Sequence, residues 1–170
     1  MKDQKVLFLT QAAMIAALYV VLTFVANAFG LANYAVQVRF SEALTILPYF
    51  TPAAIPGLFI GCLLSNILTG CALPDIIFGS LATLLGALGT YALRKWKWCV
   101  PICPIIANTI IVPLVLIYGY GLLIEGLSVL QCFGYYCITV GAGEVISCGI
   151  LGMILLFALQ KHRGKIFNKN

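Results

Sequence analysis

The sequence predicts an all-α membrane protein, folded as a bundle of six transmembrane helices. Its 170 residues are 62% hydrophobic and 9% charged, whereas about a quarter of the residues in a soluble domain are charged. No charged residue occurs at positions 6–38, and roughly 20 mainly apolar residues are enough for a spanning helix. The apolar runs also lack the alternation of a membrane β-barrel. With no linker or repeat, residues 1–170 are expected to form one domain.

The six helices are expected in apolar runs that proline, glycine or charged residues separate. The first covers residues 6–28. Lys2 and Lys5 before it are also typical of a signal peptide, but the run is too long and no cleavage site precedes a soluble domain, so it is expected to be a retained span. The second, at 39–50, is shorter and ends near two prolines. The other four are expected at 53–68, 75–93, 100–118 and 138–160.

The positions of lysine and arginine predict the orientation of the bundle. They cluster before the first helix, between the fourth and fifth helices, and after the sixth. Cytoplasmic loops carry an excess of these residues, and six spans put all three clusters on one face. Both termini are therefore expected to be cytoplasmic, with Arg39 on the opposite side. The net charge of +5 fits this topology and gives no reason to expect nucleic-acid binding.

Four acidic residues are expected in the outer half of the bundle. Glu42 lies near the outer start of the second helix, Asp75 begins the fourth, Glu125 lies in the last outer loop, and Glu144 lies in the outer half of the sixth. Ionisable groups at membrane depth are costly and generally face protein or a water-filled cavity. Their common depth predicts a polar pocket open to the outside.

Each of these residues also has an explanation without a ligand. Arg39 and Glu42 are three residues apart, so they could form an ion pair within one helix. Asp75 follows a proline and could cap the fourth helix. Glu144 is different, because the segment GAGEVI (141–146) around it is apolar and contains no basic residue. An acidic residue inside a membrane helix favours a functional role by default.

Catalytic and metal-binding motifs are missing from the sequence. The seven cysteines form no CxxC pair with partner histidines, so no metal site is expected. A disulfide between Cys132 and Cys137 is conceivable but not favoured. The single histidine, His162, lies in the C-terminal tail, where it cannot join an intramembrane catalytic dyad. The protein is therefore not expected to be an enzyme.

Small residues repeat along the first helix. Ala12 and Ala16 are four residues apart, as are Ala13 and Ala17. This spacing makes a flat stripe that another helix can approach closely. The stripe lies near the cytoplasmic end, where it could contact a partner protein or pack inside the bundle.

Two long segments resemble the QueT family. They are VQVRFSEALTILPYFTPAAIPGLFIGCL at 36–63 and ALPDIIFGSLATL at 72–84, and the resemblance extends over nearly the whole chain. Members of this family are substrate-binding (S) components of energy-coupling factor transporters, linked to precursors of queuosine. The resemblance implies a multi-pass protein of the bacterial plasma membrane.

The resemblance also implies a mechanism and a set of partners. An S-component captures its substrate outside the cell and docks on one transmembrane coupling protein and two ATPase subunits. The alanine stripe of Ala12, Ala13, Ala16 and Ala17 is similar to the surface through which S-components meet the coupling protein. The chain has no GxxxxGK[ST] loop, so ATP is expected to be used by the partner subunits. No cofactor of its own is expected.

The ligand class that the resemblance implies is a 7-deazaguanine: the aminomethyl precursor, queuine or queuosine. A carboxylate can accept two adjacent N–H donors of a guanine-like edge, and aromatic rings suit a flat base. Glu144 is the first candidate for the base edge. The further candidates for ligand contact are Asp75, Glu42, Arg39, Asn108, Phe78, Tyr118 and Tyr34.

Two other functions remain open at this point. The chain could be an S-component for a different vitamin, since the ligand depends on the pocket alone. It could also be a free-standing secondary transporter that uses Glu144 or Asp75 as a proton relay. No inverted repeat is apparent, which disfavours the second alternative.

Overall fold

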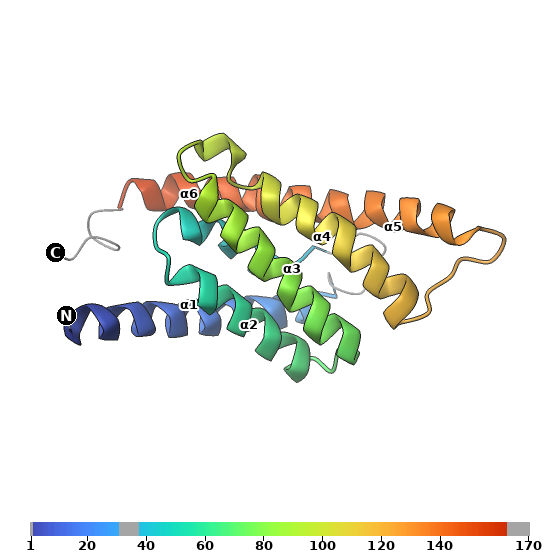
Figure 1. The fold of residues 1–170 in the computed structure, drawn as a ribbon, viewed down its shortest axis with the longest axis horizontal. Helices are drawn as coiled ribbons and strands as arrows, with labels where there is room; N and C mark the ends of the chain where they lie inside the picture. The colour runs from blue at the N-terminus through green and yellow to red at the C-terminus, as the bar shows by residue number, and fades with distance from the viewer. Residues whose placement is uncertain (1, 31–37, 163–170) are drawn as a thin grey trace.

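The computed structural model describes residues 2–30 and 38–162, and every regular element in these ranges is a helix. Figure 1 labels the six α-helices. They are α1 (Lys2–Ala28), α2 (Ala54–Leu68), α3 (Leu73–Ala92), α4 (Ile102–Leu114), α5 (Val129–Glu144) and α6 (Gly152–Gln160). The shorter elements are the 3-10 helices η1 (Phe40–Tyr49) and η2 (Lys97–Cys99), and the π-helices η3 (Val115–Gly119) and η4 (Val145–Leu151). The predicted all-α fold is confirmed.

Membrane-crossing length is reached by four helical stretches within the described ranges. They are Asp3–Ala28, Leu73–Ala92, Lys97–Gly119 and Val129–Gln160. Helix α2 is apolar but has 15 residues, which makes it shorter than these four. The first, third, fourth and fifth predicted helices lie within a few residues of α1, α2, α3 and the α4–η3 pair.

The second predicted helix is a 3-10 helix, η1, and it lies in the interior of the bundle. Its residues from Ser41 to Pro48 are all buried, and it packs against α1, α3, α6 and η4. Ten residues are long for a 3-10 helix, whose hydrogen bonds are poorer than those of an α-helix. Packing from several sides therefore stabilises this segment, and it holds Glu42 inside the protein.

The sixth predicted helix begins earlier than expected, at Val129 instead of residue 138. A capping box explains this start: the Ser128 hydroxyl accepts the N–H of Gln131 (3.4 Å), and the Gln131 side chain accepts the N–H of Ser128 (2.8 Å). Together α5, η4 and α6 cover 32 residues, about 48 Å at an α-helical rise. This is longer than a hydrocarbon core of about 30 Å, and α5 projects past the end of α4 (Figure 1). Cys132 and Cys137 are free thiols.

Helices α1 and α2 approach each other closely through small residues. A Cβ atom on Gly57 would lie 2.7 Å from the carbonyl oxygen of Ala12, and one on Gly61 would lie 3.0 Å from that of Ala16. Ala12 and Ala16 are accordingly buried, whereas Ala13 and Ala17 are exposed. Half of the alanine stripe therefore packs inside the bundle, and half faces outward.

The two ends of the bundle carry different connections (Figure 1). The start of α1, the α3–α4 connection and the end of α6 lie at one end. The α2–α3 and α4–α5 connections lie at the other end. A polar cavity is built at this second end, where the last turn of α2, the first turn of α3 and the end of η3 meet.

Candidate ligand-binding site

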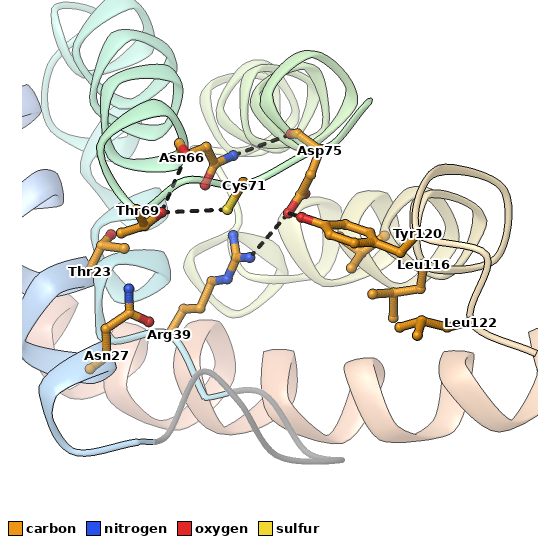
Figure 2. A pocket seen from close by; sticks show the side chains of 12 residues that line it. Thr23, Asn27, Arg39, Asn66, Thr69, Cys71, Asp75, Leu116, Tyr120 and Leu122 are labelled. Atoms are coloured by element: carbon orange, nitrogen blue, oxygen red, sulfur yellow. Dashed lines mark hydrogen bonds and ion pairs between the residues drawn. The ribbon is translucent and has the colours of Figure 1, made fainter. Parts of the chain in front are cut away.

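A cavity of about 320 Å³ lies among the ends of α1, η1, α2, α3 and η3 (Figure 2). We call it the outer cavity. Its walls combine hydroxyl, amide, carboxylate and guanidinium groups with aliphatic side chains. The lining residues are Thr23, Ala26, Asn27, Arg39, Asn66, Thr69, Cys71, Asp75, Val112, Leu116, Tyr120 and Leu122.

Asp75 is the acidic group of the outer cavity. It lies in the first turn of α3, three residues after the N-cap residue Ala72, so it is not itself the N-cap. Its carboxylate accepts a hydrogen bond from the Tyr120 hydroxyl (Oδ2 to Oη, 3.1 Å) and lies 4.0 Å from the Arg39 guanidinium (Figure 2). Its backbone carbonyl accepts the Asn66 amide (3.3 Å). The side chain therefore turns into the cavity and is held by donors from two other segments.

Arg39 precedes η1 and reaches across the cavity to α3. Within the described residues its ion pair is with Asp75, so the intrahelical pair with Glu42 that the sequence allowed is not the one formed. The Arg39 side chain is 20% exposed, which is far more buried than usual for arginine. A partly buried guanidinium beside a cavity can donate hydrogen bonds to a ligand as well as balance the charge of Asp75.

The Tyr120 side chain links the end of η3 to the start of α3 through hydrogen bonds. Its hydroxyl accepts the N–H of Ala72 (3.0 Å) and donates to Asp75. Partial burial, together with the nearby charge of Asp75, raises the pKa of Tyr120 to about 12. The hydroxyl therefore keeps its proton at neutral pH, and it can act as a donor and an acceptor at the same time.

A second group of polar residues, the inner cluster, consists of Glu42, Asn108, Glu144 and Cys148. All four are buried. The Glu42 carboxylate accepts hydrogen bonds from the Tyr19 hydroxyl and from the Asn108 amide (3.3 Å). Both oxygens of Glu42 thus have donors from within the protein, which is what a buried carboxylate requires.

Glu144 and Cys148 complete the inner cluster from the α5–η4 helix. The Cys148 thiol lies 3.1 Å from Glu144 Oε2 and 3.4 Å from the backbone carbonyl of Glu42. One ligand atom each of Glu42, Glu144 and Cys148 lies within 4.8 Å of the other two. π-Helical turns inside longer helices are frequent at functional sites, and η4 begins directly after Glu144.

The inner cluster adjoins the outer cavity but leaves almost no free space. Arg39 and Val112 border both. The recess lined by Glu42, Asn108 and Glu144 has a volume of about 10 Å³, which corresponds to roughly one water-sized probe. Together the two regions contain three carboxyl groups and one guanidinium, so the site as a whole favours ligands with several N–H donors or a positive charge.

Two of the three predicted aromatic residues lie away from the outer cavity. Phe78 and Tyr118 are 51% and 76% exposed and border an apolar groove of about 560 Å³ between α3 and the α4–η3 pair. The third, Tyr34, lies outside the described residues. Among the described residues, the aromatic side chain that borders the outer cavity is Tyr120.

Several cavity residues were not predicted from the sequence. Asn66 could have been found, because it is a strongly polar side chain in the apolar run at 53–68. Thr23 and Asn27 lie one helical turn apart on α1, and their polarity alone was a weak signal. Tyr120 gave no signal, since it lies in a connection that the sequence left undefined.

An apolar helical bundle with a polar cavity of this size is typical of membrane proteins that bind small solutes. Residues 9–161 match the QueT transporter family, and the chain belongs to this family. The family is described as one of transporters, which supports the prediction that the protein is not an enzyme.

One relative is described as "Queuosine precursor transporter QueT" from Lactococcus lactis subsp. cremoris (strain MG1363). It is 35% identical over 98 residues, and the match covers 57% of this chain and 57% of the relative. The chain thus spans a little over half the length of this relative. No solved structure matches the chain.

Proposed function

We propose that this protein is the substrate-binding S-component of an energy-coupling factor transporter that imports a 7-deazaguanine precursor of queuosine. The observation that carries the proposal is the outer cavity with Asp75, Arg39 and Tyr120 on its wall. Its volume of about 320 Å³ is at the lower end of the range for ligand pockets, which suits a small base. The name of the relative from Lactococcus lactis supports the ligand class.

The residues of the site suit the donors of a guanine-like base. In the proposed complex, the Asp75 carboxylate accepts N–H groups of the base, and Asn66 and Arg39 contact its other polar atoms. Glu144 and Glu42 form the deeper part of the site. They contact the ligand where the small recess beside Arg39 opens to admit an exocyclic group. Phe78, Tyr118 and Tyr34 stay predictions for this ligand.

The proposed topology has six membrane passes, with both termini in the cytoplasm. Helices α2 and η1 make the two short passes inside the bundle, and the other four passes have full membrane length. Nine of the ten basic residues belong to clusters at the termini and the α3–α4 connection, and the positive-inside rule favours a cytoplasmic location for them. The outer cavity then opens to the outside of a bacterial plasma membrane.

Transport in this proposal depends on partner subunits. Ala13 and Ala17 are exposed on α1, and their small side chains would let a helix of the transmembrane coupling protein approach closely. Two ATPase subunits would supply the energy, since no phosphate-binding GxxxxGK[ST] loop occurs in this sequence.

Isothermal titration of the purified protein with the aminomethyl precursor, queuine and queuosine tests the ligand. Micromolar or tighter binding of at least one is expected, and no binding of any would refute the proposal. Uptake by cells with and without the coupling protein and ATPases tests the assembly. Uptake that persists without them would instead support a free-standing transporter.

The docking surface is tested separately with bulky substitutions on α1. Ala13→Trp and Ala17→Trp are expected to abolish uptake while leaving the affinity for ligand unchanged. The matched control is Val25→Trp, at an exposed position two turns further along α1, which is expected to preserve uptake. Normal uptake by both alanine variants would disprove docking at this surface.

A further inference from the structure

The α3–α4 connection, at the end of the bundle away from the outer cavity, concentrates basic and aromatic residues. Arg94, Lys95 and Lys97 alternate there with Trp96 and Trp98, the two tryptophans of the chain. The tryptophan side chains are 62% and 67% exposed. Exposed tryptophan is typical of the membrane–water interface, because its ring is apolar and its N–H is polar.

Aromatic contacts fix the position of this connection against α6. The rings of Trp98 and Phe157 meet edge to face, with centroids 5.5 Å apart. The Lys97 ammonium lies 5.6 Å from the centroids of both rings. The Arg94 guanidinium lies 3.9 Å from the centroid of Tyr91 on the last turn of α3. Contacts of this kind hold the cations near the rings and leave their N–H donors available.

A fourth cation lies on the same side of the bundle. Lys161 follows Phe157 by four residues, so the two side chains share one face at the end of α6. In the part of the chain that the structure describes, the ion pair found is Arg39–Asp75, so these four cations have no carboxylate partner there. Three of the acidic residues lie in the outer cavity and inner cluster.

We propose that the α3–α4 connection and the end of α6 form a binding site for the phosphate of an anionic phospholipid. The exposed indoles would lie among the lipid headgroups, with Arg94, Lys95, Lys97 and Lys161 around the phosphate. Each lysine or arginine near an anionic bilayer surface strengthens binding to that surface by about fivefold. The four cations supply this attraction, and the ring contacts of Lys97 and Arg94 keep two of them in fixed positions beside the indoles. The site does not depend on the transported ligand.

Tryptophan fluorescence reports directly on this site, because both tryptophans lie in it. The purified full-length chain is reconstituted into phosphatidylcholine vesicles that contain a fixed fraction of brominated phosphatidylglycerol or of brominated phosphatidylcholine. Bromine quenches tryptophan only at short range. We expect several-fold stronger association with the brominated anionic lipid. Equal quenching by the two lipids would overturn the proposal. The four cations would then be candidates for binding a protein partner.

Two single-charge variants separate a built site from general surface attraction. Lys97→Gln removes the ammonium that lies 5.6 Å from the ring centroids of Trp98 and Phe157, and Lys5→Gln removes an exposed ammonium from the same end of the bundle. The preference for the anionic lipid is expected to fall several-fold in Lys97→Gln and to stay near the wild-type value in Lys5→Gln. Equal losses in both variants would overturn the assignment of a specific site.

Discussion

The outer cavity and the inner cluster border each other, yet their carboxyl groups have different surroundings. In the inner cluster, Glu42 accepts hydrogen bonds from Tyr19 and Asn108, and the adjoining recess has only about 10 Å³. In the outer cavity, Asp75 faces about 320 Å³ of free space while Tyr120 and Arg39 hold it from one side.

An acidic residue inside a membrane bundle is therefore not automatically a ligand group. A buried carboxylate must find donors, and those of Glu42 come from the protein itself. A ligand can reach Asp75 without disturbing the core, whereas it can reach Glu42 only by displacing internal hydrogen bonds. The outer cavity is therefore where a ligand is expected to bind first, and the inner cluster is the deeper part of the site, in which Glu42 already has its donors from the protein.

The largest effect is expected from Asp75→Asn. The amide loses the charge that strengthens hydrogen bonds to ligand N–H groups, which is worth about 2–3 kcal/mol, or roughly 30- to 150-fold in affinity. Isothermal titration with the ligand that binds wild type best measures this loss. Glu125→Gln makes the same chemical change in the α4–α5 connection at an exposed position and is expected to bind normally. If Asp75→Asn binds the ligand with wild-type affinity, the outer cavity is not the primary binding site.

Glu42→Gln is expected to change stability more than affinity. The glutamine side chain presents an amide N–H₂ where one carboxylate oxygen accepted from Tyr19 or Asn108, so that hydrogen bond must reverse or break, and the negative charge no longer strengthens either bond. The loss is expected to cost about 1–3 kcal/mol. The midpoint of unfolding by denaturing detergent measures this change. An unaltered midpoint combined with an affinity loss larger than that of Asp75→Asn would reverse the roles assigned to the two regions.

A smaller loss, about tenfold in affinity, is expected for Glu144→Gln. The Cys148 thiol at 3.1 Å is a weak hydrogen-bond donor, so a ligand N–H can replace it more easily than it can replace the donors of Glu42. The same titration measures the effect, with Cys148→Ala as the control that removes the thiol and keeps the carboxylate. Unchanged affinity in Glu144→Gln would show that the ligand contacts the outer cavity and not Glu144.

Composition and charge predicted much of this architecture. The apolar runs located α1, α2, α3 and the α4–η3 pair, because a helix is the way to satisfy backbone groups in lipid. The rule that ionisable groups avoid lipid indicated that Glu42, Asp75, Glu125 and Glu144 would lie at one depth beside a polar pocket. The structure places Asp75 in the outer cavity and Glu42 and Glu144 in the inner cluster, whereas Glu125 is exposed in the α4–α5 connection.

The rotation of each helix could not be predicted from the sequence. In a soluble helix the polar face marks the outside, but in a membrane both the lipid side and the packed side are apolar. Phe78 and Tyr118 were expected in the pocket, and they are exposed beside an apolar groove. For the same reason the sequence could not tell that Ala12 and Ala16 face α2 while Ala13 and Ala17 face outward.

The smallest effect is expected for Tyr120→Phe, which tests whether Tyr120 closes one side of the outer cavity. Removing the hydroxyl breaks its hydrogen bonds to Ala72 and Asp75, so the ligand should dissociate about fivefold faster, which corresponds to about 1 kcal/mol. Stopped-flow release of bound ligand measures this rate. Tyr135→Phe, at an exposed position on α5 (43%) that borders neither the outer cavity nor the inner recess, is the matched control and should release ligand at the wild-type rate.

The pH dependence of this release follows from the pKa of Tyr120, which is about 12. Since the pKa is raised above the ordinary value of about 10, the hydrogen bond to Asp75 is fully present below pH 10 and is lost as the pH rises through 12. Wild type and Tyr120→Phe should therefore keep the same ratio of release rates between about pH 6 and 9. A ratio that falls to one within this range would show that the Tyr120 hydroxyl does not hold the cavity closed.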